Sequence, residues 1–351
     1  MADLPEYFYF KPEGPGSSKG LFFPLEPSDV PLKDGFVIVP YKDPATGPLQ
    51  PKYFRLGKSF EKTPEASTGN PTEILLKART DKESYIRHVK KLREHIQRGN
   101  IYEINYCIQF FAENIELDPW DVFQRLFEIS RAPYSALLKM GPEYVICASP
   151  ELFLEKKNNS LISKPIKGTI KRGTTKKEDE DLKQQLHSSL KDRSENVMAV
   201  DVARNDLSML AERGTVSVNK LYNIESFETV HQMVSTVSCS IDKDTPLNKI
   251  LACTFPMASM TGAPKTRAME LIGQSENFER NFYSGTMGLL DKGDFSLCVV
   301  IRSIFYHSEE KEVSIAVGGA ITYLSDPEKE YEECLLKAQG MLKALNAKIE
   351  Q

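Results

Sequence analysis

One lysine stands where the backbone can approach a ligand closely. Lys167 precedes Gly168 in residues 163–172, a stretch that also contains a proline. Proline and glycine favour a short strand or a strand end here. A lysine in such a position can act as a nucleophile if burial or neighbouring charges lower its pKa. The alternative is a solvated basic run, because residues 163–172 contain three other basic side chains.

Two predicted helices each carry a pair of carboxylates three residues apart. Asp192 and Glu195 lie on one helix, and Glu330 and Glu333 lie on the other. This spacing puts both side chains of a pair on one helix face. Because Mg²⁺ prefers oxygen ligands and takes few of them from protein, the four carboxylates are a candidate magnesium site. The alternative for the second pair is a solvated ladder, since Lys337 follows Glu333 at the i, i+4 spacing.

Three further features suit an anionic ligand. A glycine-containing turn at residues 261–265 leads into a predicted helix, whose N-terminus offers free backbone N–H groups. Gly318 and Gly319 permit a ligand to approach the backbone. Arg302 lies in an apolar run that predicts a strand, where a guanidinium needs a partner such as a carboxylate. The turn and the glycine pair are not specific signals, since such features often have no function.

The composition is that of an ordinary globular protein. Of its 351 residues, 40% are hydrophobic and 27% are charged, and the net charge is -4. This balance does not favour a nucleic-acid partner, and no apolar run approaches the roughly 20 residues of a membrane helix. The N-terminus lacks the features of a signal peptide. The six cysteines form no paired motif, which predicts free thiols in a reducing compartment, by default the cytoplasm.

The elements that must position these residues alternate irregularly. Strands are predicted at residues 36–39, 53–56, 101–111, 134–139, 144–155, 216–218, 230–241, 285–290, 297–306 and 312–321. Helices are predicted from a capping box at residues 80–83 up to Gly99, and at residues 119–129, 178–210 with a break near Lys191, 265–272 and 326–348. Strand-rich stretches interrupted by helices indicate an α+β fold.

Together these residues resemble the chorismate-utilising enzymes, which include anthranilate, aminodeoxychorismate, isochorismate and salicylate synthases. The resemblance covers roughly residues 80–348. Its markers, in chain order, are Ser149-Pro-Glu151, Pro165-Ile-Lys-Gly-Thr169, residues 195–206, Met233-Val-Ser-Thr236, Thr261-Gly-Ala-Pro-Lys265, Tyr283-Ser-Gly285, Ile301-Arg302 and Glu330-Tyr-Glu-Glu333.

The resemblance implies a large α/β sandwich, with two central antiparallel sheets surrounded by helices. We expect one chorismate-binding domain over residues 1–351. Within it, residues 1–78 would be a shortened β-rich N-terminal part and residues 79–351 the catalytic core.

Lys167 determines which branch of the family the chain resembles. Aminodeoxychorismate synthases have Pro-Ile-Lys-Gly-Thr here, as this chain does, whereas anthranilate synthases have Pro-Leu-Ala-Gly-Thr without the amine. Water-using members place a lysine at the position of Glu103, and amine- or ammonia-using members usually place a glutamine there. The resemblance therefore implies amination of chorismate at C4 to 4-amino-4-deoxychorismate, in para-aminobenzoate and folate biosynthesis.

The implied chemistry uses two residues. Lys167 attacks ring C2 while Glu151 serves as general acid for the departing C4 hydroxyl, and ammonia then adds at C4 and expels the lysine. A free lysine with a pKa of about 10.4 is almost wholly protonated at neutral pH. We therefore expect burial, Mg²⁺ or the charge of Lys337 to lower the pKa of Lys167.

The implied binding site surrounds these two residues. Mg²⁺ is held by Glu195 and Glu333, with Asp192 and Glu330 nearby, and it binds the ring carboxylate. Arg302, Tyr283 and the Gly319 backbone grip the enolpyruvyl carboxylate. The substrate-binding residues expected in all are Gly168, Thr169, Gln232, Ser259, Tyr283, Arg302, Gly319 and Lys337.

The chain departs from the family pattern at several of these positions. The family's active-site histidine falls on Gln232, and His231, one position away on a strand, should point to the opposite face. Ala258 and Ala320 replace glycines, and Glu103 replaces the usual glutamine.

The source of ammonia is expected to be a second protein. No cysteine here lies in the Gly-x-Cys-x-Gly turn of a glutaminase, so a separate glutamine amidotransferase subunit would supply ammonia. Two alternatives remain: anthranilate synthase component I, and a non-catalytic chorismate-binding relative, which Gln232 and Glu103 motivate.

Overall fold

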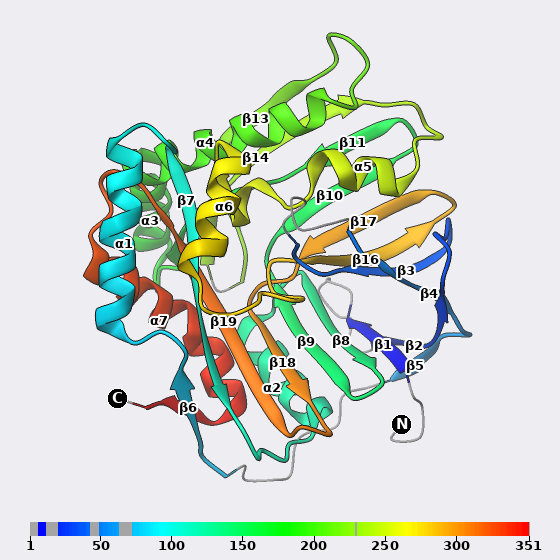
Figure 1. Ribbon diagram of the computed structural model, residues 1–351. Helices are drawn as coiled ribbons and strands as arrows, with labels where there is room; N and C mark the ends of the chain where they lie inside the picture. Colours follow the sequence, from blue (N-terminus) through cyan, green and yellow to red (C-terminus); the bar gives the residue numbers. More distant parts are fainter. Residues whose placement is uncertain (1–5, 12–19, 43–48, 63–71, 229, 351) are drawn as a thin grey trace.

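Two large antiparallel sheets form the centre of the molecule, and helices surround them (Figure 1), so the predicted α+β fold is confirmed. The computed structural model describes residues 6–11, 20–42, 49–62, 72–228 and 230–350. Its helices are α1 (Lys82–Gln97), α2 (Pro119–Ser130), α3 (Lys176–Ser188), α4 (Leu190–Ser208), α5 (Leu247–Thr254), the 3₁₀ helix η2 (Ala258–Met260), α6 (Lys265–Ser275) and α7 (Pro327–Leu345). None of the helices in these ranges has the length and apolarity needed to cross a membrane.

Sheet A is the lower sheet in Figure 1. From edge to edge it contains β6 (Ile74–Ala78), β7 (Glu103–Ala112), β19 (Glu312–Ile321), β18 (Ser303–His307), β9 (Glu143–Ser149), β8 (Tyr134–Met140), β1 (Glu6–Lys11), β2 (Gly20–Ser28) and β5 (Phe60–Lys62). The short strand β15 (Gly262–Ala263) pairs with the start of β7, and β20 (Ala347–Ile349) pairs with β6 in parallel.

Sheet B lies beside it and shares β2. From edge to edge it contains β13 (Ser217–Ser226), β14 (Val230–Ser240), β11 (Ser160–Ser163), β10 (Leu152–Lys157), β17 (Asp294–Val299), β16 (Thr286–Asp291), β3 (Gly35–Val39) and β4 (Lys52–Leu56). The strand β12 (Ile166–Lys171) follows β11 along the same edge of β14, and the second half of β2 pairs with β4.

Two chain segments pass side by side from one sheet into the other. β9 in sheet A continues through Pro150 and Glu151 into β10 in sheet B, and β17 in sheet B continues through Arg302 into β18 in sheet A. The backbone N–H of Val299 donates to the carbonyl of Glu151 at 3.0 Å, and that of Ala148 donates to the carbonyl of Arg302 at 3.3 Å. Glu151 and Arg302 therefore stand where the two sheets part.

These crossings correct two predicted strands. Single strands over residues 144–155 and 297–306 were predicted, with Arg302 in a strand interior, and both predictions were wrong. Arg302 has a φ of 53°, which lies outside the β region. The strands on both sides of each crossing are largely buried, and periodicity alone does not reveal where a buried apolar run changes sheets.

The predicted helices are present, with small errors at their ends. The break between α3 and α4 falls at Ser189, which caps α4 with its hydroxyl, close to the predicted break near Lys191. The last helix ends at Leu345, because Asn346 adopts a left-handed conformation with a φ of 52°. Lys348, predicted as helical, lies in β20 instead.

The helices cover both sheets (Figure 1). α1, α2 and α7 contact strands of sheet A, whereas α3 and α4 contact β12, β13 and β14 of sheet B. The N-terminal strands are part of both sheets, since β1 pairs with β8 and β3 pairs with β16. The interpretation of the chain as one domain stays a prediction, and this pairing favours it.

A buried ion pair joins sheet A to η2. Arg280 Nη2 lies 2.6 Å from Glu276 Oε1, and the two side chains are 1% and 3% exposed. Arg280 also donates to the carbonyls of Met260, at 2.8 Å, and Asn105, at 3.0 Å. Glu276 accepts the backbone N–H of Cys107 at 2.9 Å. This pair therefore fixes the start of β7 against the segment that precedes α6.

Replacing Glu276 with alanine should strongly destabilise the fold. The change would leave the Arg280 guanidinium buried without its counter-ion, which typically costs about 3–5 kcal/mol. The matched control is Glu270→Ala, which breaks the exposed pair between Arg267 and Glu270, whose side chains are 40% and 46% exposed. Denaturant titration monitored by circular dichroism should show a much lower midpoint for Glu276→Ala only. Equal midpoints for the two variants would show that the buried Glu276–Arg280 pair does not stabilise the fold more than the exposed pair does.

Candidate active site

A buried lysine–glutamate pair links the two sheets. Lys167 on β12 and Glu103 at the start of β7 are 8% and 3% exposed, and Lys167 Nζ donates to Glu103 Oε1 at 2.6 Å. This is a short, charge-assisted contact. Lys167 is therefore not part of a solvated basic run, and that alternative was wrong.

Gly168 allows β12 to approach α4. Its φ is +88°, and a Cβ there would lie 2.9 Å from the side chain of Asp192. The register with β14 shifts between Ile166 and Thr169. Lys167 consequently faces the interior, while the side chain of Thr169 is exposed at this edge.

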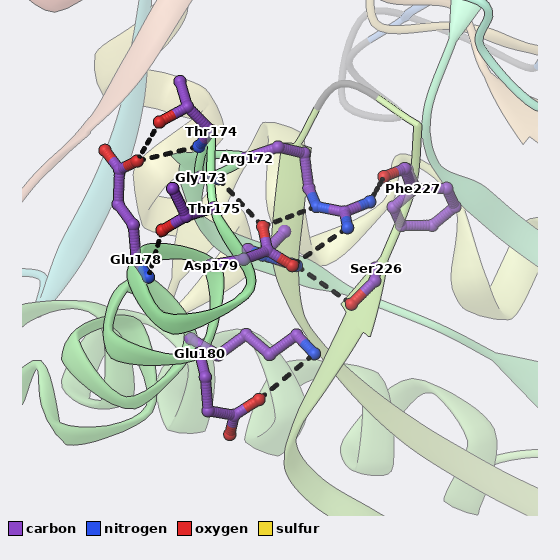
Figure 2. A network of polar contacts seen from close by, with 11 residues as sticks. Arg172, Gly173, Thr174, Thr175, Glu178, Asp179, Glu180, Ser226 and Phe227 are labelled. Atoms are coloured by element: carbon purple, nitrogen blue, oxygen red, sulfur yellow. Dashed lines mark hydrogen bonds and ion pairs between the residues drawn. The ribbon is translucent and has the colours of Figure 1, made fainter.

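A polar network holds the far end of β12 against α3 (Figure 2). Arg172 Nε and Nη2 donate to Asp179 at 2.8 and 2.9 Å, and the backbone N–H of Gly173 donates to the same carboxylate at 2.8 Å. His231 Nε2 also lies 2.8 Å from Asp179 Oδ1. His231 therefore belongs to this network, on the side of β14 away from Gln232, as strand alternation predicts. Gln232 is buried and its Oε1 has no hydrogen-bond partner within the described residues.

The turn at residues 261–265 positions Glu103. Gly262 and Ala263 form β15, which pairs with Ile104 and Glu103. Lys265, at the end of this turn, fixes its position. Lys265 Nζ donates to Asp206 Oδ2 at 2.5 Å, and both side chains of this ion pair are largely buried. This turn therefore has a structural role, and its binding of an anion stays a prediction.

The charges around Lys167 are carboxylates. Burial alone would lower the pKa of Lys167, but Glu103, Glu195 and Glu151 raise it above its ordinary value. The expectation of a lowered pKa was therefore wrong. The sequence motif identifies the amine, but it does not reveal how many carboxylates the fold places around it.

Glu151 has the protonation behaviour of a general acid. It is buried at the crossing from β9 to β10, and burial raises its pKa to about 7, against the lowering influence of the Ser259 hydroxyl and Lys167. Its backbone N–H donates to Ser149 Oγ at 3.2 Å. A carboxyl group that titrates near neutrality can both give and take a proton during turnover.

Ser259, on η2, is held by Asn105, whose amide donates to the Ser259 carbonyl at 3.1 Å.

The carboxylates of α4 and α7 converge on one ammonium group. Lys191 Nζ lies 3.1 Å from Glu330 Oε1, 3.7 Å from Glu333 Oε2 and 3.8 Å from Glu195 Oε1. Burial alone would lower the pKa of Lys191, but Glu330, Glu195 and Glu333 raise it. Sequence analysis missed Lys191 as a site residue. Its position four residues before Glu195, one helical turn away, was the available signal.

The donor set fits magnesium chemically. Glu195 Oε1 and Glu330 Oε2 are buried without a hydrogen-bond partner among the described residues, and burial raises the pKa of Glu195 to about 7. No group of three His, Cys, Asp or Glu side chains in the described ranges forms a ready-made metal site. Mg²⁺ needs no such cage, since it commonly binds one or two carboxylates together with water and an anionic substrate. Asp192, three residues before Glu195 on α4, lies against Gly168.

The predicted anion-binding residues lie next to these carboxylates. Lys337 Nζ donates to Glu333 Oε1 and to the Gly318 carbonyl, both at 2.8 Å. A Cβ on Gly319 would lie 3.5 Å from Glu330 Oε2, so the backbone of β19 faces α7 closely there. Arg302 Nη1 donates to the Lys337 carbonyl at 3.3 Å.

Arg302 is available for an anionic partner. Within the described residues it forms no ion pair with a carboxylate, and burial lowers its pKa. The phenol of Tyr283, which is buried nearby, and the carboxylate of Glu333 both interact electrostatically with Arg302. A guanidinium at a sheet crossing that forms no ion pair with a carboxylate of the described residues suits bidentate binding of a ligand carboxylate.

The structure therefore brings most of the predicted residues to one region, whereas the side chain of Thr169 is exposed at the edge of the sheet. They lie on β12, β14, β19, η2, α4 and α7, on the segment before β16 and at the two sheet crossings. The arrangement offers an amine nucleophile, a carboxylic acid, oxygen ligands for a cation and cationic groups for carboxylates. The chemical role of each residue stays a prediction.

Three curated relatives are similar in sequence over most of this chain. A probable chloroplastic aminodeoxychorismate synthase from Oryza sativa subsp. japonica is 42% identical over 268 residues, which are 75% of this chain and 30% of that protein. Anthranilate synthase component 1 from Acetivibrio thermocellus is 36% identical over 78% of this chain and 55% of its own length. Aminodeoxychorismate synthase component 1 from Escherichia coli (strain K12) is 34% identical over 75% of this chain and 58% of its own length. The chain thus spans between 30% and 58% of the length of these relatives.

The fold also matches solved structures. A putative 2,3-dihydroxybenzoate-specific isochorismate synthase from Bacillus anthracis superposes with a TM-score of 0.79 over 98% of this chain and 96% of that chain, at 22% identity. The profile of the chorismate binding enzyme family matches residues 45–343. Profile, relatives and fold agree, and the chain belongs to the chorismate binding enzyme family.

Proposed function

We propose that this chain aminates chorismate at C4 and produces 4-amino-4-deoxychorismate for para-aminobenzoate and folate biosynthesis. The observation that carries the proposal is the amine of Lys167, buried on β12 among carboxylates. The names of the rice and E. coli relatives support the same activity. The relative named anthranilate synthase supports the alternative of amination at C2, which the buried amine disfavours.

In the proposed reaction, the protein supplies a nucleophile and an acid. Arg302, Tyr283 and the Gly319 backbone hold the enolpyruvyl carboxylate of chorismate. Lys167 Nζ forms a bond to ring C2 while Glu151 protonates the departing C4 hydroxyl, which leaves as water. Ammonia then bonds to C4 as the bond between C2 and the lysine breaks.

We also propose that magnesium binds between α4 and α7. Glu195 and Glu333 would hold it, with Asp192 and Glu330 nearby, and this placement is supported by the buried oxygens of Glu195 and Glu330 that accept no hydrogen bond from the described residues. Bound there, the ion supplies positive charge that neutralises the ring carboxylate of chorismate and favours departure of the hydroxyl.

The proposal includes a partner and a location. A separate glutamine amidotransferase subunit would supply ammonia, and the designation of the E. coli relative as component 1 supports a second component. We propose the cytoplasm as the location. All six cysteines are free thiols, five of them buried, as is typical of a reducing compartment.

The purified chain should convert chorismate with ammonium and Mg²⁺, but not with glutamine. The product should have the mass of 4-amino-4-deoxychorismate, and an added lyase should convert it to para-aminobenzoate. Formation of anthranilate would support the alternative synthase instead. Turnover with glutamine alone would remove the need for a partner, and no product under any condition would favour a non-catalytic relative.

The side chain of Lys191 should compete with magnesium. Its ammonium contacts the same carboxylates that would hold the ion, so Lys191→Met should bind Mg²⁺ at least about tenfold more tightly, or about 1.4 kcal/mol. Titration calorimetry on the chain without substrate measures this directly. The matched control is Lys183→Met on α3, where the lysine pairs with Glu180 at 3.4 Å and with no other carboxylate of the described residues. Unchanged or weaker binding in Lys191→Met would show that the ion does not share this group of carboxylates.

A further inference from the structure

We propose that Glu103 is the proton acceptor of Lys167: it takes a proton from the ammonium as the amine attacks chorismate and returns it when the amine leaves. This inference rests on the proposed amination and assigns a role to a residue that the resemblance does not explain. It answers a question that the site itself raises, namely how a lysine surrounded by carboxylates becomes a neutral nucleophile.

The contact between the two side chains carries the inference. Lys167 Nζ and Glu103 Oε1 are 2.6 Å apart, both side chains are more than nine-tenths buried, and Lys167 Nζ donates to no other side chain of the described residues. Glu103 is also held rigidly, since its backbone pairs with Ala263 of β15. A proton can therefore pass directly between these two atoms without a solvent molecule.

Burial makes such a transfer energetically accessible. An ammonium and a carboxylate in contact lose much of their hydration when they are buried, and their mutual attraction repays this only in part. A neutral amine beside a neutral carboxylic acid avoids that desolvation penalty. The charged and neutral forms of this pair therefore lie closer in free energy than they would in water.

The other charged groups around Lys167 come from three further elements. Glu195 belongs to α4, Glu333 to α7, and Glu151 to the crossing between β9 and β10. All three favour the ammonium form electrostatically, but none of them forms a hydrogen bond with it in the described structure. Glu151 is already assigned to the C4 hydroxyl, which leaves Glu103 as the acceptor in contact with the amine.

The proton balance closes over one turnover. Glu103 takes one proton from the Lys167 ammonium, and the neutral amine bonds to C2 while Glu151 gives its proton to the hydroxyl, which leaves as water. Ammonia bonds to C4, and the bond between C2 and the lysine nitrogen breaks with its electron pair returning to the amine. The new C4 ammonium gives one proton to Glu151, and Glu103 returns its proton to Lys167. The sum is chorismate plus ammonia giving 4-amino-4-deoxychorismate plus water.

The test compares Glu103→Gln, Glu103→Asp and wild type. Glutamine keeps the size and hydrogen-bonding capacity of the side chain but cannot take the proton, whereas aspartate keeps a carboxylate. The control Glu143→Gln changes an exposed glutamate that pairs with Lys52 at the surface. Steady-state amination is measured at saturating chorismate and ammonium across neutral to alkaline pH. The amination rate of each variant is divided by the wild-type rate at the same pH, so that the effects of ammonium and Glu151 titration cancel.

The proposal predicts a specific pattern. At neutral pH, Glu103→Gln should lower kcat at least about tenfold, towards the range of about 10²–10⁴ typical of lost proton transfer, with little change in KM for chorismate. Its ratio to wild type should recover as pH rises, because Lys167 then loses its proton to solvent. Glu103→Asp should regain part of the loss at neutral pH, and Glu143→Gln should match wild type throughout.

Three results would overturn the inference. A Glu103→Gln chain as fast as wild type at neutral pH would mean that the carboxylate is unnecessary. A faster chain would mean that the carboxylate only keeps the Lys167 amine protonated. A loss that does not recover with pH, or that Glu103→Asp does not relieve, would mean a structural role. These results leave the proposed amination intact, whereas a wild-type chain without 4-amino product refutes the amination and this inference together.

Discussion

The site depends on the balance between buried carboxylates and the few cations that accompany them. Glu103, Glu151, Glu195 and Glu330 are all buried, and an unpaired buried charge is strongly unfavourable. Lys167 contacts Glu103, and a second ammonium, that of Lys191, contacts the carboxylates of α4 and α7. In this account the positive and negative side chains of the site nearly balance before chorismate and Mg²⁺ bind. During binding and catalysis, each of these side chains therefore exchanges a protein partner for a ligand partner.

The fold creates this concentration of charge at the place where its sheets part. Strands that cross from one sheet to the other place Glu151 and Arg302 on adjacent segments where the sheets part, and β7 and β12, from different sheets, bring Glu103 to Lys167. Glu103 and Lys167 belong to strands, and the carbonyls of Glu151 and Arg302 accept backbone hydrogen bonds from the strands beside them. Rigid elements hold catalytic groups more accurately than loops do, which suits a reaction that needs an amine and an acid at two carbons of one ring.

Sequence reasoning predicted the carboxylate pairs of the candidate site, because helix spacing is regular. The carboxylate pairs on α4 and α7 and the opposite faces of His231 and Gln232 follow from periodicity alone. The sheet crossings could not be predicted, since buried apolar runs continue through them. The raised pKa of Lys167 was also missed, because it depends on carboxylates brought from β7, α4 and a crossing that are distant in the chain.

The central claim is that Lys167 directs nitrogen to C4, and the position of nitrogen in the product tests it most directly. Wild type and Lys167→Ala would each be incubated with chorismate, Mg²⁺ and ammonium labelled at nitrogen. Nuclear magnetic resonance would then identify the ring carbon that bears the labelled nitrogen. The account predicts label at C4 alone for wild type. For Lys167→Ala it predicts a large loss of rate, with any residual label at C2, where ammonia attacks directly when the lysine is absent. A Lys167→Ala chain that places nitrogen at C4 at the wild-type rate would contradict it.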